Sequence, residues 1–242
     1  MSTYRNRTLS SNDRKRVLLR KLLVKERLRD HALSVSQQVM WDAQRVDSSS
    51  RANHLKVTCK IEHAICLENL QNSLEQTLCR HPVLRSRFIE KDTGTFQIYC
   101  KDGSPKISTS YISKSDEYSL EDTIVNLSGQ PYDLLHGWPF RIHVFILESG
   151  SSLLFLGFHH IVIDGQGIRV FLEDLYRFYM GENPESSSHS YRAFVDWQSS
   201  NLQSSQAQVS FEFWKREFKE SPSWIPLPYL KSSRDWKGSN VD

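Results

Sequence analysis

Hydrophobic and polar residues follow two different periods along the chain, and these periods predict a mixture of strands and helices. The period of two in "HLKVTCKIEH" (residues 54–63) predicts a strand with one polar face. The runs "FRIHVFIL" (140–147) and "LLFLGFHH" (153–160), joined by "ESGSS", predict a hairpin. Because "LLFLGF" is apolar throughout, we expect its strand to be buried on both faces, in the middle of a sheet.

Apolar residues spaced three or four positions apart predict helices around these strands. Residues 165–181 carry one apolar face and end at a glycine, which is typical of a helix packed on a core. Because helices and strands mix without regular alternation, we expect an α/β or α+β fold with a mixed central sheet flanked by helices. The other predicted elements are a strand at 95–100 and helices over 67–81, 120–130, 191–200 and 209–218. The polar residues 101–120 are expected to be irregular.

Three segments are expected along the chain. Residues 1–30 predict a basic linker or docking helix, because they hold ten Lys or Arg and three Asp or Glu. Residues 31–218 hold the periodic elements and are expected to form the globular part. Residues 219–242 are punctuated by proline and predict an extended connector.

The composition excludes several classes of function. Of the residues, 38% are hydrophobic and 24% are charged, as in ordinary globular proteins. The net charge of +3 belongs to the first segment, and no folded basic face with interleaved aromatics predicts nucleic-acid binding. No apolar stretch is long enough to span a bilayer, and the first residues lack the hydrophobic region of a secretory signal. We therefore expect a cytoplasmic protein with neither nucleic acid nor membrane as partner, whose four cysteines are free thiols.

The stretch "FHHIVIDGQG" (158–167) holds the residues best suited to chemistry. Side chains alternate between the faces of a strand, so His159 and His160 should point to opposite sides. This favours one structural imidazole and one that faces a cleft, where a neutral ring can accept a proton at pH 7. A turn could bring Asp164 beneath the ring or against an arginine, and Gly165 allows a close backbone approach.

Two other interpretations of this stretch stay open. A two-His-one-carboxylate iron site can be drawn from HHxxxD, but the alternation of the two histidines opposes it, and we expect no metal. In the simpler interpretation, both histidines are satisfied core residues, and Asp164 caps the following helix.

Several motifs, in this order along the chain, resemble those of nonribosomal peptide synthetase condensation domains, within the superfamily of chloramphenicol acetyltransferase-like acyltransferases. HHxxxDG between a buried strand and an amphipathic helix is similar to the family's signature. Two departures are Val39, where the first motif usually has Arg, and Gln166–Gly167, where Trp-Ser is common. The further similar segments are "LSVSQQVMW" (33–41, family form SxAQxRxW), "RHPVLRSRF" (80–88, RHxxLRxxF), "QPYDLLHGWPFRIHVF" (130–145) and "YRAFVDWQ" (191–198).

The resemblance implies a fold and roles for individual residues. A full condensation domain has two acetyltransferase-like lobes around a tunnel, and this chain resembles the N-terminal lobe followed by the connector between the lobes. By resemblance, His160 acts as general base or positions the attacking amine, and His159 is buried and supportive. Asp164 is structural, in an ion pair with Arg80 or Arg85, and Gly165 keeps the backbone beside the reacting carbonyl free of a side chain.

The resemblance also implies the reaction and its partners. The reaction is amide formation between a donor thioester and an acceptor amine, with both substrates on phosphopantetheine arms of carrier proteins and no cofactor of the domain itself. The partners are then carrier proteins and the missing C-terminal lobe. The enzymatic alternatives are ester formation, epimerisation or CoA-dependent acylation on the same fold. Heterocyclisation does not fit, because that subgroup has aspartates in place of the two histidines. The alternative from another class is a non-catalytic lobe that binds a carrier or a partner lobe.

Overall fold

The structure is a computed structural model that describes residues 31–100, 103–116, 119–185 and 190–220. The helix expected within residues 1–30 lies outside the described residues, and so does nearly all of the expected connector. The chain divides into two compact units, Met1–Val195 and Asp196–Asp242.

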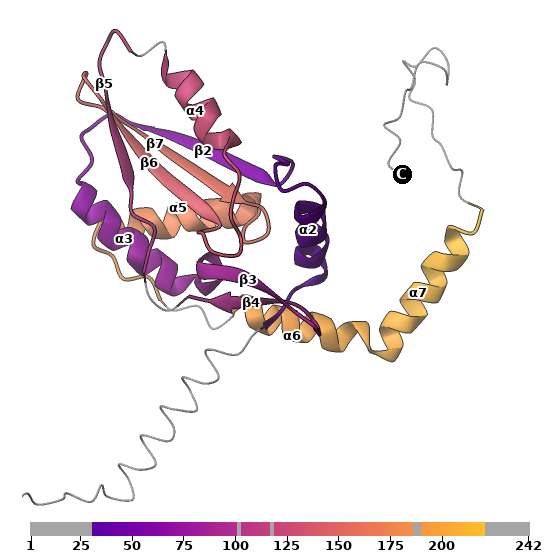
Figure 1. The fold of residues 1–242 in the computed structure, drawn as a ribbon. Coiled ribbons are helices and arrows are strands. Elements are labelled where there is room, and N and C mark those ends of the chain that lie inside the picture. Colours follow the sequence, from indigo (N-terminus) through magenta and orange to yellow (C-terminus); the bar gives the residue numbers. More distant parts are fainter. Residues whose placement is uncertain (1–30, 101–102, 117–118, 186–189, 221–242) are drawn as a thin grey trace, which may run out of the picture. The chain divides into compact units, whose positions relative to one another are not determined.

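A four-stranded mixed sheet forms the centre of the first unit (Figure 1). Its order is β2 (His54–Ile61), β7 (Ser152–His159), β6 (Phe140–Leu147) and β5 (Ser108–Ile112). β2, β7 and β6 pair antiparallel, whereas β5 runs parallel to β6. The predicted strand over 54–63, the predicted hairpin and the central position of its second strand are confirmed.

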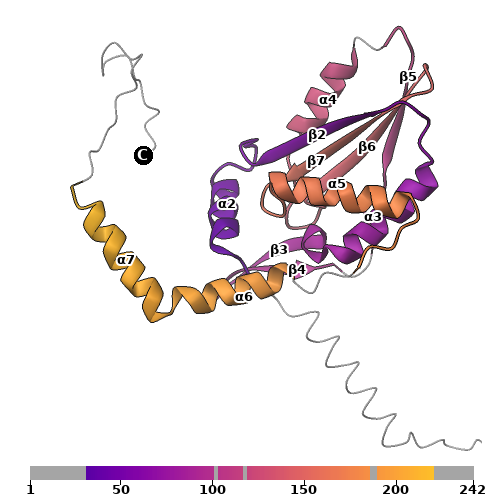
Figure 2. The ribbon, with the colours of Figure 1, turned by 180° about the vertical axis from the view of Figure 1, so that it is seen from behind.

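Helices cover both faces of this sheet (Figures 1 and 2). Apolar side chains of β6 and β7 point alternately to the two faces, so both strands contribute to a core on each side. One face packs against α3 (Leu67–Arg80) and α5 (Gly165–Tyr179), and the other packs against α4 (Leu120–Gly129). The larger core includes Leu74, Leu78, Phe140, Val144, Leu156, Phe158, Phe171 and Leu175, and the smaller core on the α4 face is built on Ile112, Phe145 and Phe155. The expectation of a mixed sheet flanked by helices is confirmed.

A second, three-stranded sheet was not predicted. It has the order β1 (His31–Ala32), β4 (Gly94–Tyr99) and β3 (Ser86–Lys91), and α2 (Val35–Val46) follows β1. A single-turn 3₁₀ helix over Pro82–Arg85 joins α3 to β3. Trp41 of α2 stacks on Phe88 of β3, with ring centroids 5.5 Å apart, so the sheet and α2 share one core.

One expectation about the central sheet is wrong. Residues 108–112, within the segment expected to be irregular, form β5. The sequence "STSYI" is mostly polar because β5 is an edge strand whose outer side chains are exposed, and only Ile112 is buried. Pairing with β6 therefore makes this segment a strand, although its own polar pattern does not predict one.

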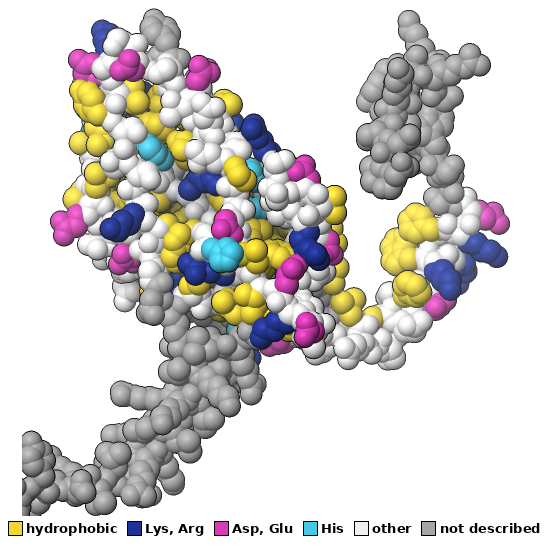
Figure 3. Space-filling model, in the orientation of Figure 1, with side chains coloured by type: hydrophobic (Ala, Val, Ile, Leu, Met, Phe, Trp, Pro, Cys, Tyr) yellow, Lys and Arg dark blue, Asp and Glu magenta, His cyan; other side chains and the backbone are white. Residues whose placement is uncertain are grey.

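The helices predicted over 191–200 and 209–218 are present as α6 (Tyr191–Leu202) and α7 (Ser205–Glu217), and the boundary between the units falls within α6. The hydroxyl of Ser204 accepts a hydrogen bond from the Ala207 amide and caps α7. Hydrophobic side chains gather on α7 in the space-filling view (Figure 3). The large exposed ones on or next to this helix are Val209, Phe211, Phe213, Trp214 and Phe218.

Candidate active site

The HHxxxDG residues occupy the tight turn between β7 and α5. β7 ends at His159, and the Val162 amide donates a hydrogen bond to the His159 carbonyl at 3.2 Å. The His160 amide donates to the Asn53 carbonyl at 2.8 Å, just before β2 begins. The turn is therefore attached to the neighbouring strand at the point where the second histidine leaves the sheet.

The side chain of His159 is fully buried, and both of its ring nitrogens are in use. Its Nδ1 accepts a hydrogen bond from the Ile161 amide at 3.1 Å, so the proton of the neutral ring must lie on Nε2. That nitrogen lies 3.3 Å from Oε1 of Gln44, to which it can donate. The ring is surrounded by those of His54 and Tyr132, with centroids 6.1 and 5.9 Å away. Both nitrogens are thus engaged, and this ring supports the turn.

The surroundings of His159 keep its imidazole neutral. Its pKa is lowered from the ordinary 6.5 to about 4, mainly by burial and to a lesser degree by charge on His54 and His160. The pKa of His54 is also lowered, mainly by burial and to a lesser degree by the Arg141 and Arg51 charges. The Nδ1 of His54 donates to the Ser128 carbonyl at 3.2 Å, which fixes this ring against the end of α4.

The protein is expected to lose stability in mild acid because of His159. Between pH 6.5 and about 4 the unfolded chain binds a proton that the folded ring refuses, so the free energy of unfolding falls as pH falls through this window. The loss from this ring between pH 7.5 and pH 5 is about 2 kcal/mol. Urea unfolding at both pH values measures it. The His159→Phe variant should be less stable at pH 7.5 but show a smaller acid loss, and an equal loss in both proteins would contradict this cause.

His160 differs from His159 in every respect that matters for reactivity. Its side chain is half-buried, and it is the first residue after β7. Its Nδ1 is buried, and among the described residues it has no hydrogen-bond partner. An imidazole without a fixed partner can take or give a proton, which the fully engaged His159 cannot do.

Asp164 caps helix α5. Its Oδ1 accepts the Gly167 amide at 2.7 Å, and its side chain is exposed. This is the capping role of the simpler interpretation, and it is compatible with a structural role in an active site. The pKa of the Tyr191 phenol is raised, mainly by burial and to a lesser degree by the Asp164 charge.

The expected ion pair between Arg80 and Asp164 is wrong. The Nε of Arg80 lies 2.8 Å from Oδ2 of Asp174, and Nε2 of His81 lies 2.6 Å from the same oxygen. The reason is the packing of the helices, because the end of α3 lies beside the middle of α5, and Asp174 is about 15 Å further along that helix than its cap. The alternative pair of Arg85 with Asp164 stays a prediction.

The two glycines at the start of α5 differ in what surrounds them. A Cβ added at Gly165 would meet no atom within 4 Å, so its expected role beside a reacting carbonyl stays a prediction. A Cβ added at Gly167 would lie 2.7 Å from Cγ1 of Ile163 and 3.3 Å from Oδ1 of Asp164. A side chain at position 167 would therefore have to displace Ile163.

This contrast gives a prediction on stability. Gly167→Ala should lower the free energy of unfolding by about 1–2 kcal/mol, because the new methyl crowds Ile163 and the cap. Gly165→Ala, two residues earlier on the same helix, should change it by no more than about 0.5 kcal/mol. Urea unfolding of the two variants tests the difference, and equal values would mean that the crowding is relieved without cost.

Sequence reasoning missed two residues that hold the turn. Gln37 of α2 donates from Nε2 to the Ile161 carbonyl at 3.0 Å, and Ser34 bonds to the Tyr191 hydroxyl at 2.8 Å. Ser34 and Gln37 also form a capping box, each side chain bonding the other's amide at 3.1 Å. The S-x-x-Q spacing in "LSVSQQ" was the available signal for this box, although it does not reveal the contact with the turn.

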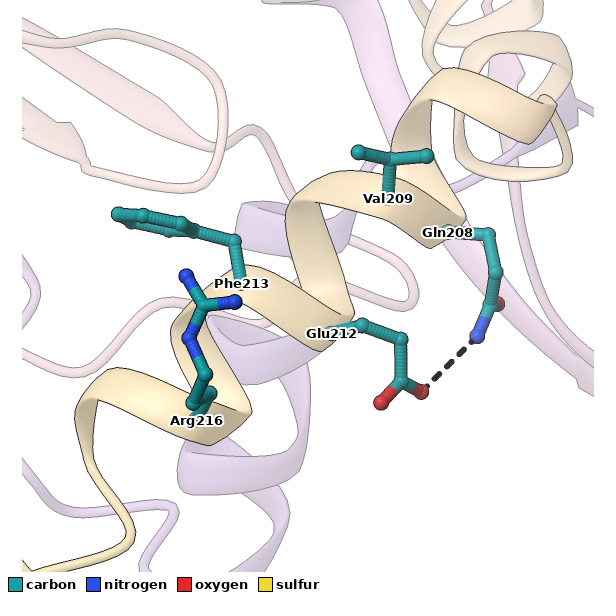
Figure 4. A pocket seen from close by; sticks show the side chains of 5 residues that line it. All are labelled: Gln208, Val209, Glu212, Phe213 and Arg216. Atoms are coloured by element: carbon teal, nitrogen blue, oxygen red, sulfur yellow. Dashed lines mark hydrogen bonds between the residues drawn. The ribbon is translucent and has the colours of Figure 1, made fainter.

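The second unit has an open pocket of its own (Figure 4). Its lining is one face of α7, made of Gln208, Val209, Glu212, Phe213 and Arg216. The amide of Gln208 donates to Glu212 at 3.2 Å, and the Arg216 guanidinium lies 5.5 Å from the ring centre of Phe213.

Within the described ranges, no three His, Cys, Asp or Glu side chains gather as a metal site would require. None of the described helices is both long and apolar enough to cross a bilayer.

Comparison with known proteins gives relatives that are synthetases. The chain is 25% identical over 196 residues to the hybrid PKS-NRPS synthetase pydA of an Acremonium species, which covers 81% of this chain and 5% of that protein. It is 24% identical over 198 residues to surfactin synthase subunit 1 of Bacillus subtilis strain 168, covering 82% of this chain and 5% of that protein. The chain thus spans a small part of these relatives.

Solved structures share the fold. The first condensation domain of the calcium-dependent antibiotic synthetase, in complex with a substrate analogue, matches with a TM-score of 0.68 and 22% identity, over 80% of this chain and 48% of that one. The starter condensation domain of rhizomide synthetase RzmA matches with a TM-score of 0.70 and 20% identity, over 81% and 49%. Residues 28–241 match the family model of the condensation domain. The chain therefore belongs to the condensation domain family, and it spans about half the length of the solved members it resembles.

Proposed function

We propose that this chain supplies the histidine-bearing half of an active site that joins a carrier-bound acyl or aminoacyl donor to a carrier-bound amine. The observation that carries the proposal is the contrast between the two imidazoles. His159 has both ring nitrogens engaged, whereas His160 has a buried Nδ1 with no partner among the described residues. Condensation needs an imidazole that can exchange a proton at the attacking amine, and His160 is the candidate that this turn offers.

The chemistry balances without a protein nucleophile. The acceptor amine attacks the donor thioester carbonyl, a C–N bond forms, and the C–S bond breaks. The proton lost by the amine passes to the departing thiolate, and His160 is the described residue suited to accept, relay or orient it. Holding two tethered substrates together supplies much of the remaining rate. The phosphopantetheine arms belong to the carriers, so the domain itself requires no cofactor.

The partners follow from the same proposal. They are the two carrier proteins and a second lobe of the condensation fold, because this chain covers about half of the solved domains. The cytoplasm is the proposed location, and the four cysteines are free, as is usual in a reducing compartment.

A non-catalytic interaction lobe is the second candidate, and one observation favours it. Phe211, Phe213 and Trp214 of α7 are between 45% and 60% exposed. Large apolar side chains exposed together in this way are typical of a surface that another protein covers. The same side chains would also serve a catalytic lobe that docks onto a second lobe, so exposure alone does not separate the two functions.

A single-turnover assay separates them. Donor and acceptor carriers are loaded, and the acceptor carrier is analysed by mass spectrometry with the chain alone or with a separately expressed second lobe. We expect amide product only when both lobes are present. Product from the chain alone would contradict the need for a second lobe. Carrier binding without product in either mixture would favour the interaction lobe. A parallel reaction with a hydroxyl-bearing acceptor tests ester formation.

A further inference from the structure

Gln37 lies on the buried face of α2, and its side chain reaches the turn that carries His160. It is 1% exposed, and its Nε2 donates to the carbonyl of Ile161 at 3.0 Å. The same nitrogen lies 3.3 Å from Oε1 of Gln97, which is also buried. Its Oε1 accepts the Ser34 amide at 3.1 Å. Both polar atoms of this amide are therefore engaged inside the protein.

The contact falls on the peptide after Ile161, one residue beyond His160. The Ile161 amide donates to Nδ1 of His159, and the Ile161 carbonyl accepts from Gln37, so side chains hold this residue from both sides. The His160 amide is held by the Asn53 carbonyl at 2.8 Å. Three separate elements thus fix the backbone on either side of His160, which restricts the direction of its Cα–Cβ bond.

The ring of His160 depends on this backbone. Its buried Nδ1 has no hydrogen-bond partner among the described residues, so no side-chain bond described there orients the imidazole. In a site where the base must lie within hydrogen-bond reach of the amine, an unanchored ring is aimed by its backbone and its packing.

We propose that Gln37 is a positioning residue for His160, acting through the Ile161 carbonyl. The network extends through Ser34 to the hydroxyl of Tyr191, so it links α2, α6 and the turn. The proposal rests on the proposed function, since positioning matters only if His160 serves the reaction. It deepens that function by assigning a residue on α2 to the geometry of the site.

The first test needs no activity. In the 242-residue chain, Gln37→Leu keeps most of the side-chain volume and removes both donors. We expect the Ile161 and Val162 amides to exchange with solvent roughly tenfold faster, and the ring resonances of His160 to shift. The Leu156 amide in the centre of β7 should keep its protection. The matched control is Gln38→Leu, because Gln38 is the half-buried neighbour whose amide bonds Asp42 at 2.9 Å on the same helix.

A second variant distinguishes the loss of hydrogen bonds from the loss of packing. Gln37→Glu retains the acceptor for Ser34, but its ionised carboxylate would face the oxygens of Ile161 and Gln97. When protonated, its hydroxyl can donate to the Ile161 carbonyl. Protection of the Ile161 amide in this variant should therefore improve at low pH, relative to Gln37→Leu. A residue that only fills space would show no such recovery.

The activity test uses both lobes and loaded carriers. Gln37→Leu should lower kcat by about 10- to 100-fold with little change in KM for the carriers. Unchanged exchange at Ile161 and an unchanged His160 ring signal in folded Gln37→Leu would overturn the inference. A fall in protection with an unchanged kcat in an active domain would overturn it too. If the unsubstituted domain itself makes no product, the proposed function fails, while the exchange and ring data still decide whether Gln37 holds the turn.

Discussion

Replacing His160 with alanine should slow single-turnover amide formation in the two-lobe assay by about 10²- to 10⁴-fold, the usual contribution of general acid–base catalysis. The same change should alter the free energy of unfolding by less than about 1 kcal/mol, because it removes a buried nitrogen that has no partner among the described residues. Loss of activity without loss of stability is the signature of a group retained for chemistry. Product formation is measured by mass spectrometry and stability by urea unfolding.

The neighbouring histidine is the matched control. His159→Ala removes two hydrogen bonds and a fully buried ring, so it should lower both stability and activity. If His160→Ala retained the full rate, the reaction would need no base at this position, and substrate positioning alone would account for turnover. If it unfolded the protein as readily as His159→Ala, the contrast between the two rings would be wrong.

Removing the carboxylate of Asp174 should cause the largest loss of stability. Its side chain is 7% exposed and pairs with both Arg80 and His81 through one oxygen, Oδ2. The side chains of Arg80 and His81 are 19% and 25% exposed. Asp174→Ala leaves these two groups without their shared acceptor and should cost about 3 kcal/mol, the lower end for a broken buried ion pair. Asp174→Asn keeps an acceptor oxygen and should cost about 1–2 kcal/mol. Urea unfolding at neutral pH measures both changes.

The adjacent residue provides the comparison. Glu173 also faces an arginine, Arg169, but at 3.8 Å and with both side chains more than half exposed. Glu173→Ala should therefore change the free energy of unfolding by no more than about 0.5 kcal/mol. Similar losses for Asp174→Ala and Glu173→Ala would show that the Arg80–His81 cluster does not hold α3 to α5.

Periodicity alone predicted the elements that carry the site. The hairpin of β6 and β7 and the helix α5 have long, consistent patterns. The opposite orientations expected for His159 and His160 stay a prediction, because β7 ends at His159. The Arg80 alternative for the ion pair with Asp164 was wrong because only helix packing decides which carboxylate near α5 meets Arg80. β5 was missed because its pairing outweighs its polar sequence. The contact between Gln37 and Ile161 joins residues 124 positions apart, a separation that no local pattern encodes.

The pairing of β2 with β7 has a consequence for the order in which the protein folds. β6 and β7 are joined by a short turn and can associate early, whereas His54 pairs with His159, roughly a hundred residues later in the chain. During synthesis β2 must therefore wait until β7 has left the ribosome. Since the His160 amide is anchored beside β2, the turn acquires its final shape only when this long loop closes. Assembly of the site is thus a late event, and substitutions in β2 should slow its formation even where they leave the finished fold intact.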